Sequence, residues 1–153
     1  MRQIIMTLTA MLFLSCSCKK TDVMALTRQE KLYITIGDVT KTATLVNNEA
    51  TQELMARLQQ ASVTVTLNSS GGFEIWGTLG FSLTTSNEQV NVQPGDIVLY
   101  NGSNICMFYG TNSWSYTRLG HIDGLSDSEL RTFLHAGESN ISVTLSMNNT
   151  NRI

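Results

Sequence analysis

The chain has 153 residues, of which 42% are hydrophobic and 14% charged, so its length predicts a single domain and its composition excludes a disordered chain. Ten basic and twelve acidic residues give a net charge of −2, which offers no basic surface for nucleic acid. The two histidines have no ligand cluster around them in the sequence, so no metal site is predicted, and no cofactor motif is present.

The first residues follow the pattern of a secretory signal peptide. Arg2 precedes an uncharged, largely apolar run over residues 4–14. This run is shorter than the roughly 20 residues that a membrane-spanning helix needs, and Lys19 and Lys20 follow it closely. We therefore expect residues 1–15 to be a signal peptide that directs export.

The end of this segment resembles the lipobox of bacterial lipoproteins. Residues 13–16 read Phe-Leu-Ser-Cys, and in such proteins the cysteine, here Cys16, becomes the acylated first residue of the mature chain. The resemblance implies a lipid anchor in a bacterial membrane, facing the periplasm or the cell exterior, with residues 16–30 as a polar tether. Two alternatives are acylation of Cys18 and ordinary cleavage that releases a soluble exported protein.

The domain is expected to open with a β-hairpin followed by a helix. Gly37-Asp38 marks the hairpin turn, and Asn48 is placed to cap a helix whose apolar residues recur every three or four positions. Alternation of apolar and polar residues then predicts two more strands. The expected elements in this half are strands over 32–36 and 39–46, a helix over 49–60, strands over 63–67 and 73–79, and a long polar loop over 84–93.

The most apolar part of the chain lies between residues 94 and 122. Pro94-Gly95 suits a type II turn, because proline fixes φ and glycine accepts the positive φ that follows. Residues 97–100 and 105–109 are apolar on both alternating faces, which predicts central strands covered on both sides. A third strand follows and carries an isolated arginine, Arg118. Cys106 is expected to be a small core residue.

The last third of the chain predicts a helix and a strand. Residues 126–129 read Ser-Asp-Ser-Glu, which is a capping box, and the short helix after it should turn Leu130, Phe133 and Leu134 inward. Alternating apolar residues predict a final strand over 141–147, and residues 148–153 should fray. The expected total is eight strands and two helices.

These patterns together resemble the bacterial cyclophilin-like domain family, a small-barrel relative of the cyclophilins. The likeness covers residues 32–147 and implies a mainly β fold, a closed eight-stranded barrel over 31–147 with two short helices capping its open ends. The most specific motif is the run over 115–122, in which His121 stands where an arginine is usual. The motifs that carry the likeness are Asn48-Glu49-Ala50-Thr51, Ile75-Trp76-Gly77, Pro94-Gly95-Asp96-Ile97 and the run Ser-Tyr-Thr-Arg-Leu-Gly-His-Ile over 115–122.

Catalytic cyclophilins are peptidyl-prolyl isomerases that hold the substrate carbonyl with an arginine from a Phe-His-Arg segment. This chain contains neither that segment nor the associated glutamine-glycine-glycine pattern, so the resemblance does not carry the activity over. Arg118 offers the same electrostatic role from a different strand. Alternatively, its stem packs on the barrel and its head pairs with a carboxylate such as Asp123.

The candidate binding residues are mostly aromatic. Alternation from Trp114 places Tyr116 and Arg118 on one face of a regular strand, and the polar run before Trp114 favours its exposure. The alternative is that the aromatic side chains belong to the core of a small barrel. The predicted ligand-binding set is Trp76, Phe81, Trp114, Tyr116, Arg118 and His121.

Three functions follow from this reading. We favour a lipid-anchored, monomeric module that binds a peptide or small ligand in a groove on the barrel wall. One alternative is a divergent peptidyl-prolyl isomerase with Arg118 as its catalytic residue. The other is an interaction partner of a flavodoxin-like redox protein, which the resemblance implies because relatives occur with such proteins, although flavodoxins are cytoplasmic.

Overall fold

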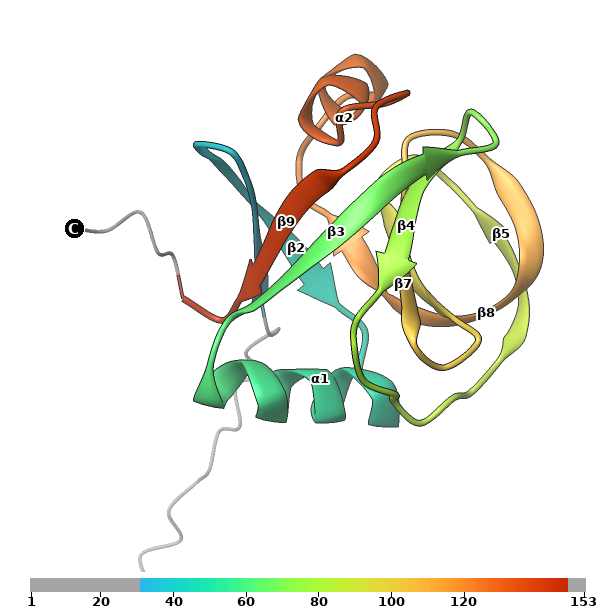
Figure 1. Cartoon of the computed structure of the whole chain (residues 1–153). Coiled ribbons are helices and arrows are strands. Elements are labelled where there is room, and N and C mark those ends of the chain that lie inside the picture. Colours follow the sequence, from blue (N-terminus) through green and yellow to red (C-terminus); the bar gives the residue numbers. More distant parts are fainter. Residues whose placement is uncertain (1–30, 149–153) are drawn as a thin grey trace, which may run out of the picture.

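The computed structural model describes residues 31–148, which form an antiparallel β-barrel (Figure 1). The strands follow one another around the barrel in the order β2-β1-β9-β3-β4-β7-β6-β8, and pairing of β2 with β8 closes the ring. This confirms the predicted mainly β fold and the closed eight-stranded barrel. The elements are β1 (Lys31–Ile36), β2 (Val39–Leu45), α1 (Glu49–Gln60), β3 (Val63–Ser70), β4 (Glu74–Thr78), β5 (Glu88–Val92), β6 (Asp96–Tyr100), β7 (Asn104–Phe108), β8 (Asn112–Ile122), α2 (Asp127–Phe133) and β9 (Ile141–Ser146).

The predicted signal peptide, Cys16 and the tether lie outside the described residues, as do residues 149–153 of the tail that we expected to fray. Within the described part of the chain, no helix is long and apolar enough to cross a membrane.

A ninth strand replaces part of the predicted long loop. β5 pairs antiparallel with the first half of β8, with Glu88 opposite Tyr116 and Val92 opposite Asn112. Val90 and Val92 are fully buried, so two alternating valines among polar residues were the strand signal. The loop prediction was therefore wrong for residues 88–92, whereas the eight-strand barrel is confirmed because β5 lies outside the closed ring.

The two helices lie at opposite ends of the barrel (Figure 1). α1 begins at Asn48, whose side chain accepts a hydrogen bond from the Thr51 backbone N–H at 2.9 Å. α2 begins at Ser126, where Ser126 and Glu129 form the predicted capping box. Both helices turn apolar side chains into the barrel, which confirms the expected inward faces. The buried helical residues include Leu54, Leu58, Leu130 and Phe133.

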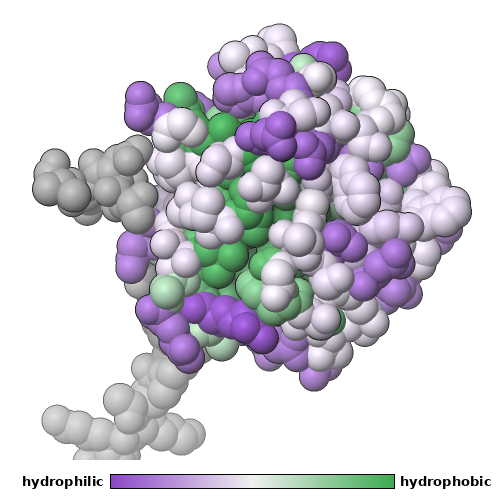
Figure 2. Space-filling view, viewed as in Figure 1, coloured by the Kyte–Doolittle hydropathy of each residue, from purple (hydrophilic) through white to green (hydrophobic). Residues whose placement is uncertain are grey.

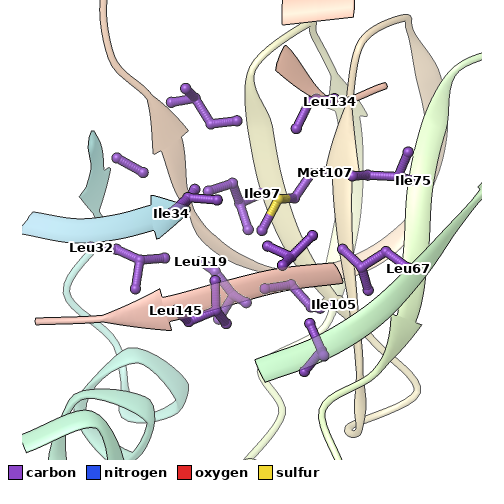
Figure 3. Close-up of a cluster of buried hydrophobic side chains, with 14 of the residues drawn as sticks. Leu32, Ile34, Leu67, Ile75, Ile97, Ile105, Met107, Leu119, Leu134 and Leu145 are labelled. Atoms are coloured by element: carbon purple, nitrogen blue, oxygen red, sulfur yellow. The ribbon is translucent and has the colours of Figure 1, made fainter. Parts of the chain in front are cut away.

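The main core fills the barrel interior (Figure 3). It is built from the inward positions of the strands, and Figure 3 shows that side chains from β1, β3, β4, β6, β7, β8 and β9 converge there. Leu99 and Val143 are fully buried in it, as we expect of residues on central strands. The largest buried members labelled in the figure are Leu32, Ile34, Leu67, Ile75, Ile97, Ile105, Met107 and Leu119.

A second apolar cluster lies on the outer side of β6 and β7. Cys106 and Phe108 alternate with the inward residues of β7, and they pack with Val98 of β6 and Tyr116 of β8. In Figure 1 the curled ribbon of β5 and β8 lies on the side of β4 and β7 that is away from β3 and β9. β6 and β7 are therefore covered on both faces, which confirms the prediction drawn from their apolar runs.

Glycine marks the point where the barrel closes. A Cβ atom on Gly120 of β8 would lie 2.4 Å from the Thr44 backbone oxygen of β2, so only glycine lets these two strands approach. One residue earlier, β8 has a β-bulge, because Ile97 lies opposite Gly120 whereas Val98 lies opposite Arg118. The extra residue, Leu119, is fully buried.

Figure 2 shows the surface of the face on which β9 and β3 lie. Hydrophobic side chains (green) run down the middle of this face, and hydrophilic side chains (purple) gather at the two ends, near α1 and α2.

Candidate functional site

The predicted site residues of β8 share one face of the strand. Val90 lies opposite Trp114 and Glu88 opposite Tyr116, while Val98 lies opposite Arg118 across the other edge. The β-bulge comes after Arg118, so alternation is unbroken over the three predicted residues. This face is turned toward the outer side of β6 and β7 rather than into the barrel.

Three of the predicted residues line one hollow on this outer wall, which we call the aromatic hollow. It has a volume of about 270 Å³. Trp114 is 56% exposed and Trp76 is 37% exposed, whereas Tyr116 is 4% exposed and forms the floor. The expectation that Trp114 is exposed is therefore confirmed. The hollow is lined by Ser70, Glu74, Trp76, Tyr100, Cys106, Asn112, Trp114 and Tyr116.

The aromatic rings of the hollow stand at steep angles to one another. The Tyr100 ring lies 6.5 Å from the Trp76 ring at 79°, and 6.1 Å from the Tyr116 ring at 70°. Behind them, Phe108 meets Tyr116 edge to face at 5.8 Å. Edge-to-face contact is a favoured arrangement of aromatic pairs. The aromatic rings therefore line the hollow with their planes in different orientations.

Glu74 brings a carboxyl group into this apolar setting. Its Oε2 atom is buried and has no hydrogen-bond partner, the one such side-chain atom among the described residues. Burial raises the pKa of Glu74, and a hydrogen bond from the Cys106 thiol acts in the opposite direction. Since a buried carboxylate oxygen without a partner costs free energy, this group has an unmet requirement for a donor or a cation.

Two neighbours of Glu74 carry protons that they keep at neutral pH. Burial, with the nearby Glu74 charge, raises the pKa of the Cys106 thiol far above its ordinary value, so this residue is a thiol and not a nucleophilic thiolate. Burial also raises the pKa of Tyr116, whose phenol oxygen accepts a hydrogen bond from Asn112 Nδ2 at 2.9 Å. The hollow is therefore suited to binding and offers no activated nucleophile.

Arg118 and His121 line a different hollow, between β8, β6 and the start of α1, which we call the helix-side groove. Its volume is about 820 Å³. Arg118 Nε lies 3.0 Å from Glu88 Oε1, and His121 Nδ1 lies 2.8 Å from Asp96 Oδ1. The groove is also lined by residues of β2, α1 and the segment between them, among them Thr44, Val46, Asn47, Thr51 and Met55.

The partner of Arg118 differs from the one that we named. The alternative reading of Arg118 was an ion pair with a carboxylate such as Asp123, and Arg118 does pair with a carboxylate, but the partner is Glu88. Asp123 instead accepts hydrogen bonds from Lys31 Nζ and Thr42 Oγ1, both at 2.8 Å. β5 brings Glu88 to Arg118, and the missed strand is the reason that this partner was not anticipated.

The remaining predicted residue, Phe81, lies apart from both hollows. The Arg57 guanidinium of α1 lies over its ring, 4.2 Å from the centroid, and Phe81 packs against the main core. Across residues 31–148, no group of three or more histidine, cysteine or acidic side chains is placed to hold a metal ion.

Sequence reasoning did not find five residues of the aromatic hollow: Ser70, Glu74, Tyr100, Cys106 and Asn112. The sequence could have predicted Glu74, because it stands two residues before Trp76 and so lies on the same face of β4. Cys106 is opposite Trp76 in the ladder between β4 and β7. That pairing depends on which strands are neighbours, which the sequence did not reveal.

Comparison with known proteins gives the family of the barrel. The model of the cyclophilin-like family matches residues 34–146, which is most of the described chain. The chain belongs to the cyclophilin-like family. Its fold is also similar to the solution structure of a hypothetical protein from Archaeoglobus fulgidus, with a TM-score of 0.56 and 20% sequence identity over 78% of this chain and 95% of that one. No curated protein matches the chain.

Within this cyclophilin-like barrel, the predicted site is divided between two places on the wall. Trp76, Trp114 and Tyr116 meet at the aromatic hollow, whereas Arg118 and His121 face the helix-side groove. A ligand held by the aromatic rings therefore does not meet an arginine in the same hollow.

Proposed function

We propose that this protein is a lipid-anchored, extracytoplasmic cyclophilin-like module that binds a peptide or small ligand on its barrel wall, at the aromatic hollow. The proposal combines the lipobox-like residues around Cys16 with the wall site built from β4, β6, β7 and β8. It describes a binding protein rather than a catalyst.

One observation carries the binding site. The sequence contains two tryptophans, and both line the same hollow while keeping more than a third of their surface exposed. Large aromatic side chains gain free energy by burial, so two of them held around an open hollow form a surface that is completed by a ligand. Small-molecule sites are generally concave and apolar with a few polar groups, which is the composition found here.

The binding proposal is tested by titration monitored by tryptophan fluorescence. Because both tryptophans line the hollow, their emission reports this site directly. The probes are an unstructured Ala-Pro peptide and three compounds with a common tert-butyl group, namely tert-butanol, tert-butylammonium and pivalate. We expect a saturable change with at least one probe, and a loss of at least about tenfold in its affinity in Trp114→Ala, since the variant removes one wall.

Two further variants serve as controls for this titration. Trp114→Phe keeps an aromatic wall and is expected to retain most of the affinity. Arg118→Ala changes the helix-side groove and should leave binding at the aromatic hollow unaltered. Affinity lost in Arg118→Ala but kept in Trp114→Ala would move the ligand site to the helix-side groove. No saturable response to any probe would contradict binding at the aromatic hollow.

The membrane anchor has its own test. Cys16→Ser removes the sulfur that would be acylated, and acyl chains stabilise membrane attachment by about 0.8 kcal/mol per buried methylene. We expect the variant to move from the membrane fraction to the soluble fraction after cell lysis and centrifugation. Cys18→Ser is the matched control and should stay with the membrane. The reverse result would assign the anchor to Cys18.

A further inference from the structure

We propose that the aromatic hollow selects ligands that carry an alkylammonium group, with the cation against the aromatic walls and the Glu74 carboxylate as its counter-charge. This inference rests on the proposed function of the hollow and adds the chemical class of its ligand. It is carried by three observations: the charge of the lining, the unpartnered oxygen and the arrangement of the rings.

The charge of the lining favours a cation. Of the described residues that line the hollow, Glu74 alone carries a charged side chain. The two basic side chains nearest in sequence to this part of β8, Arg118 and His121, line the helix-side groove and already have carboxylate partners. The Glu74 charge is therefore not neutralised by a basic residue of the hollow.

The unpartnered oxygen requires a hydrogen-bond donor. Glu74 Oε2 is buried and lacks a partner, while the same carboxyl group receives a hydrogen bond from the Cys106 thiol. An ammonium N–H supplies both a donor and a positive charge, and charge-assisted hydrogen bonds are stronger than neutral ones. A neutral apolar ligand would leave the oxygen without a partner, and an anion would be repelled by it.

The rings supply the second part of the recognition. Trp76, Tyr100 and Tyr116 form successive edge-to-face contacts, so their faces point in different directions around the hollow. Trp114 adds a further, largely exposed ring. Cations bind to the negative faces of aromatic rings, tryptophan best, and groups of such rings recognise alkylated ammonium ions. The alkyl groups meanwhile bury apolar surface against the same rings.

The test compares probes that differ only in charge. The full-length protein is titrated with tert-butylammonium, tert-butanol and pivalate, whose shared tert-butyl group makes the same apolar contacts, and tryptophan fluorescence is recorded. We expect tert-butylammonium to bind at least about tenfold more tightly than tert-butanol, and pivalate to bind most weakly, because one charge-assisted contact accounts for a factor of this size.

Two glutamate variants separate the role of Glu74 from that of net charge. Glu74→Gln is nearly isosteric and should reduce the affinity for tert-butylammonium to that for tert-butanol, without changing the affinity for tert-butanol. Glu49→Gln removes the same charge from an exposed position at the start of α1 and should leave all three affinities unchanged. Retained tert-butanol binding in Glu74→Gln also shows that the hollow is still folded.

A pH series gives a second, independent measurement. Because burial raises the pKa of Glu74, the affinity for tert-butylammonium should fall as the pH is lowered through the raised pKa, where the carboxylate takes up a proton. The affinity for tert-butanol should stay constant over the same range. The pH dependence should be absent in Glu74→Gln.

The outcomes distinguish this inference from the proposed function. Equal affinities for tert-butylammonium and tert-butanol, both reduced in Trp114→Ala, would overturn the choice of an ammonium ligand and leave the binding hollow intact. Tighter binding of pivalate would overturn it in the same way. Tert-butylammonium binding that is unchanged in Glu74→Gln would remove Glu74 from the site. Absence of any response that depends on Trp114 would overturn the proposed function itself.

Discussion

At the scale of single residues, Glu74 is the one charged side chain among the described residues that line the aromatic hollow. Its neighbours Cys106 and Tyr116 keep their protons, and its own buried Oε2 atom has no hydrogen-bond partner. Trp76 and Trp114 keep more than a third of their surface exposed in the same hollow. Holding the Glu74 carboxyl group here without a hydrogen-bond partner for Oε2 costs free energy.

Stability should therefore depend on pH through Glu74. Its pKa is raised in the folded state, so between the ordinary value of 4.5 and the raised value the folded chain binds more protons than the unfolded chain. The free energy of unfolding then decreases as pH rises through that range. Glu74→Gln removes the titrating carboxyl group, and with it this decrease in the free energy of unfolding. We expect the variant to be more stable than the parent at neutral pH and about equally stable below pH 4.5, by urea unfolding.

Glu49→Gln is the control, since it removes an exposed charge at the N-terminus of α1, where only a small change is expected. A constant difference between Glu74→Gln and the parent at all pH values would contradict the assigned role of the carboxyl group.

At the scale of elements, the sequence predicted most strands and both helices because their patterns are local. The capping residues Asn48 and Ser126 and the Gly95 turn, which has φ of +96°, all appear where their residue types require them. β5 was missed because only two valines stand among polar residues. It forms by pairing with β8, and a contact between distant strands has no local pattern.

The central strands should carry much of the stability. Leu99 of β6 is fully buried in the main core, so Leu99→Ala should lower the free energy of unfolding by about 2 to 5 kcal/mol, measured by urea unfolding. Val39→Ala in β2 is the control, because Val39 is 48% exposed and its truncation should cost less than about 0.5 kcal/mol. Equal losses in the two variants would mean that Leu99 is not a core residue.

At the scale of the whole molecule, the closed barrel followed from the resemblance together with the number of strands. The division of the site did not. Alternation correctly placed Trp114, Tyr116 and Arg118 on one face of β8, but β8 is long enough to pair with β5 at its start and with β6 and β2 toward its end. Its single face therefore borders two hollows, and this depends on which strands pair with β8 along its length.

This division also decides the expectation for prolyl isomerisation. Uncatalysed rotation about an X-Pro bond takes tens to hundreds of seconds, and catalysis requires a positive group and a proline pocket that are preorganised together. Arg118 is paired with Glu88 and lines the helix-side groove, whereas Trp114 and Tyr116 line the aromatic hollow. We therefore expect no measurable acceleration of cis-trans exchange in an unstructured Ala-Pro peptide, followed by NMR exchange spectroscopy, and the same result with Arg118→Ala. Fast exchange that disappears in Arg118→Ala, but persists in Trp114→Ala, would make the helix-side groove an active site and the protein an enzyme.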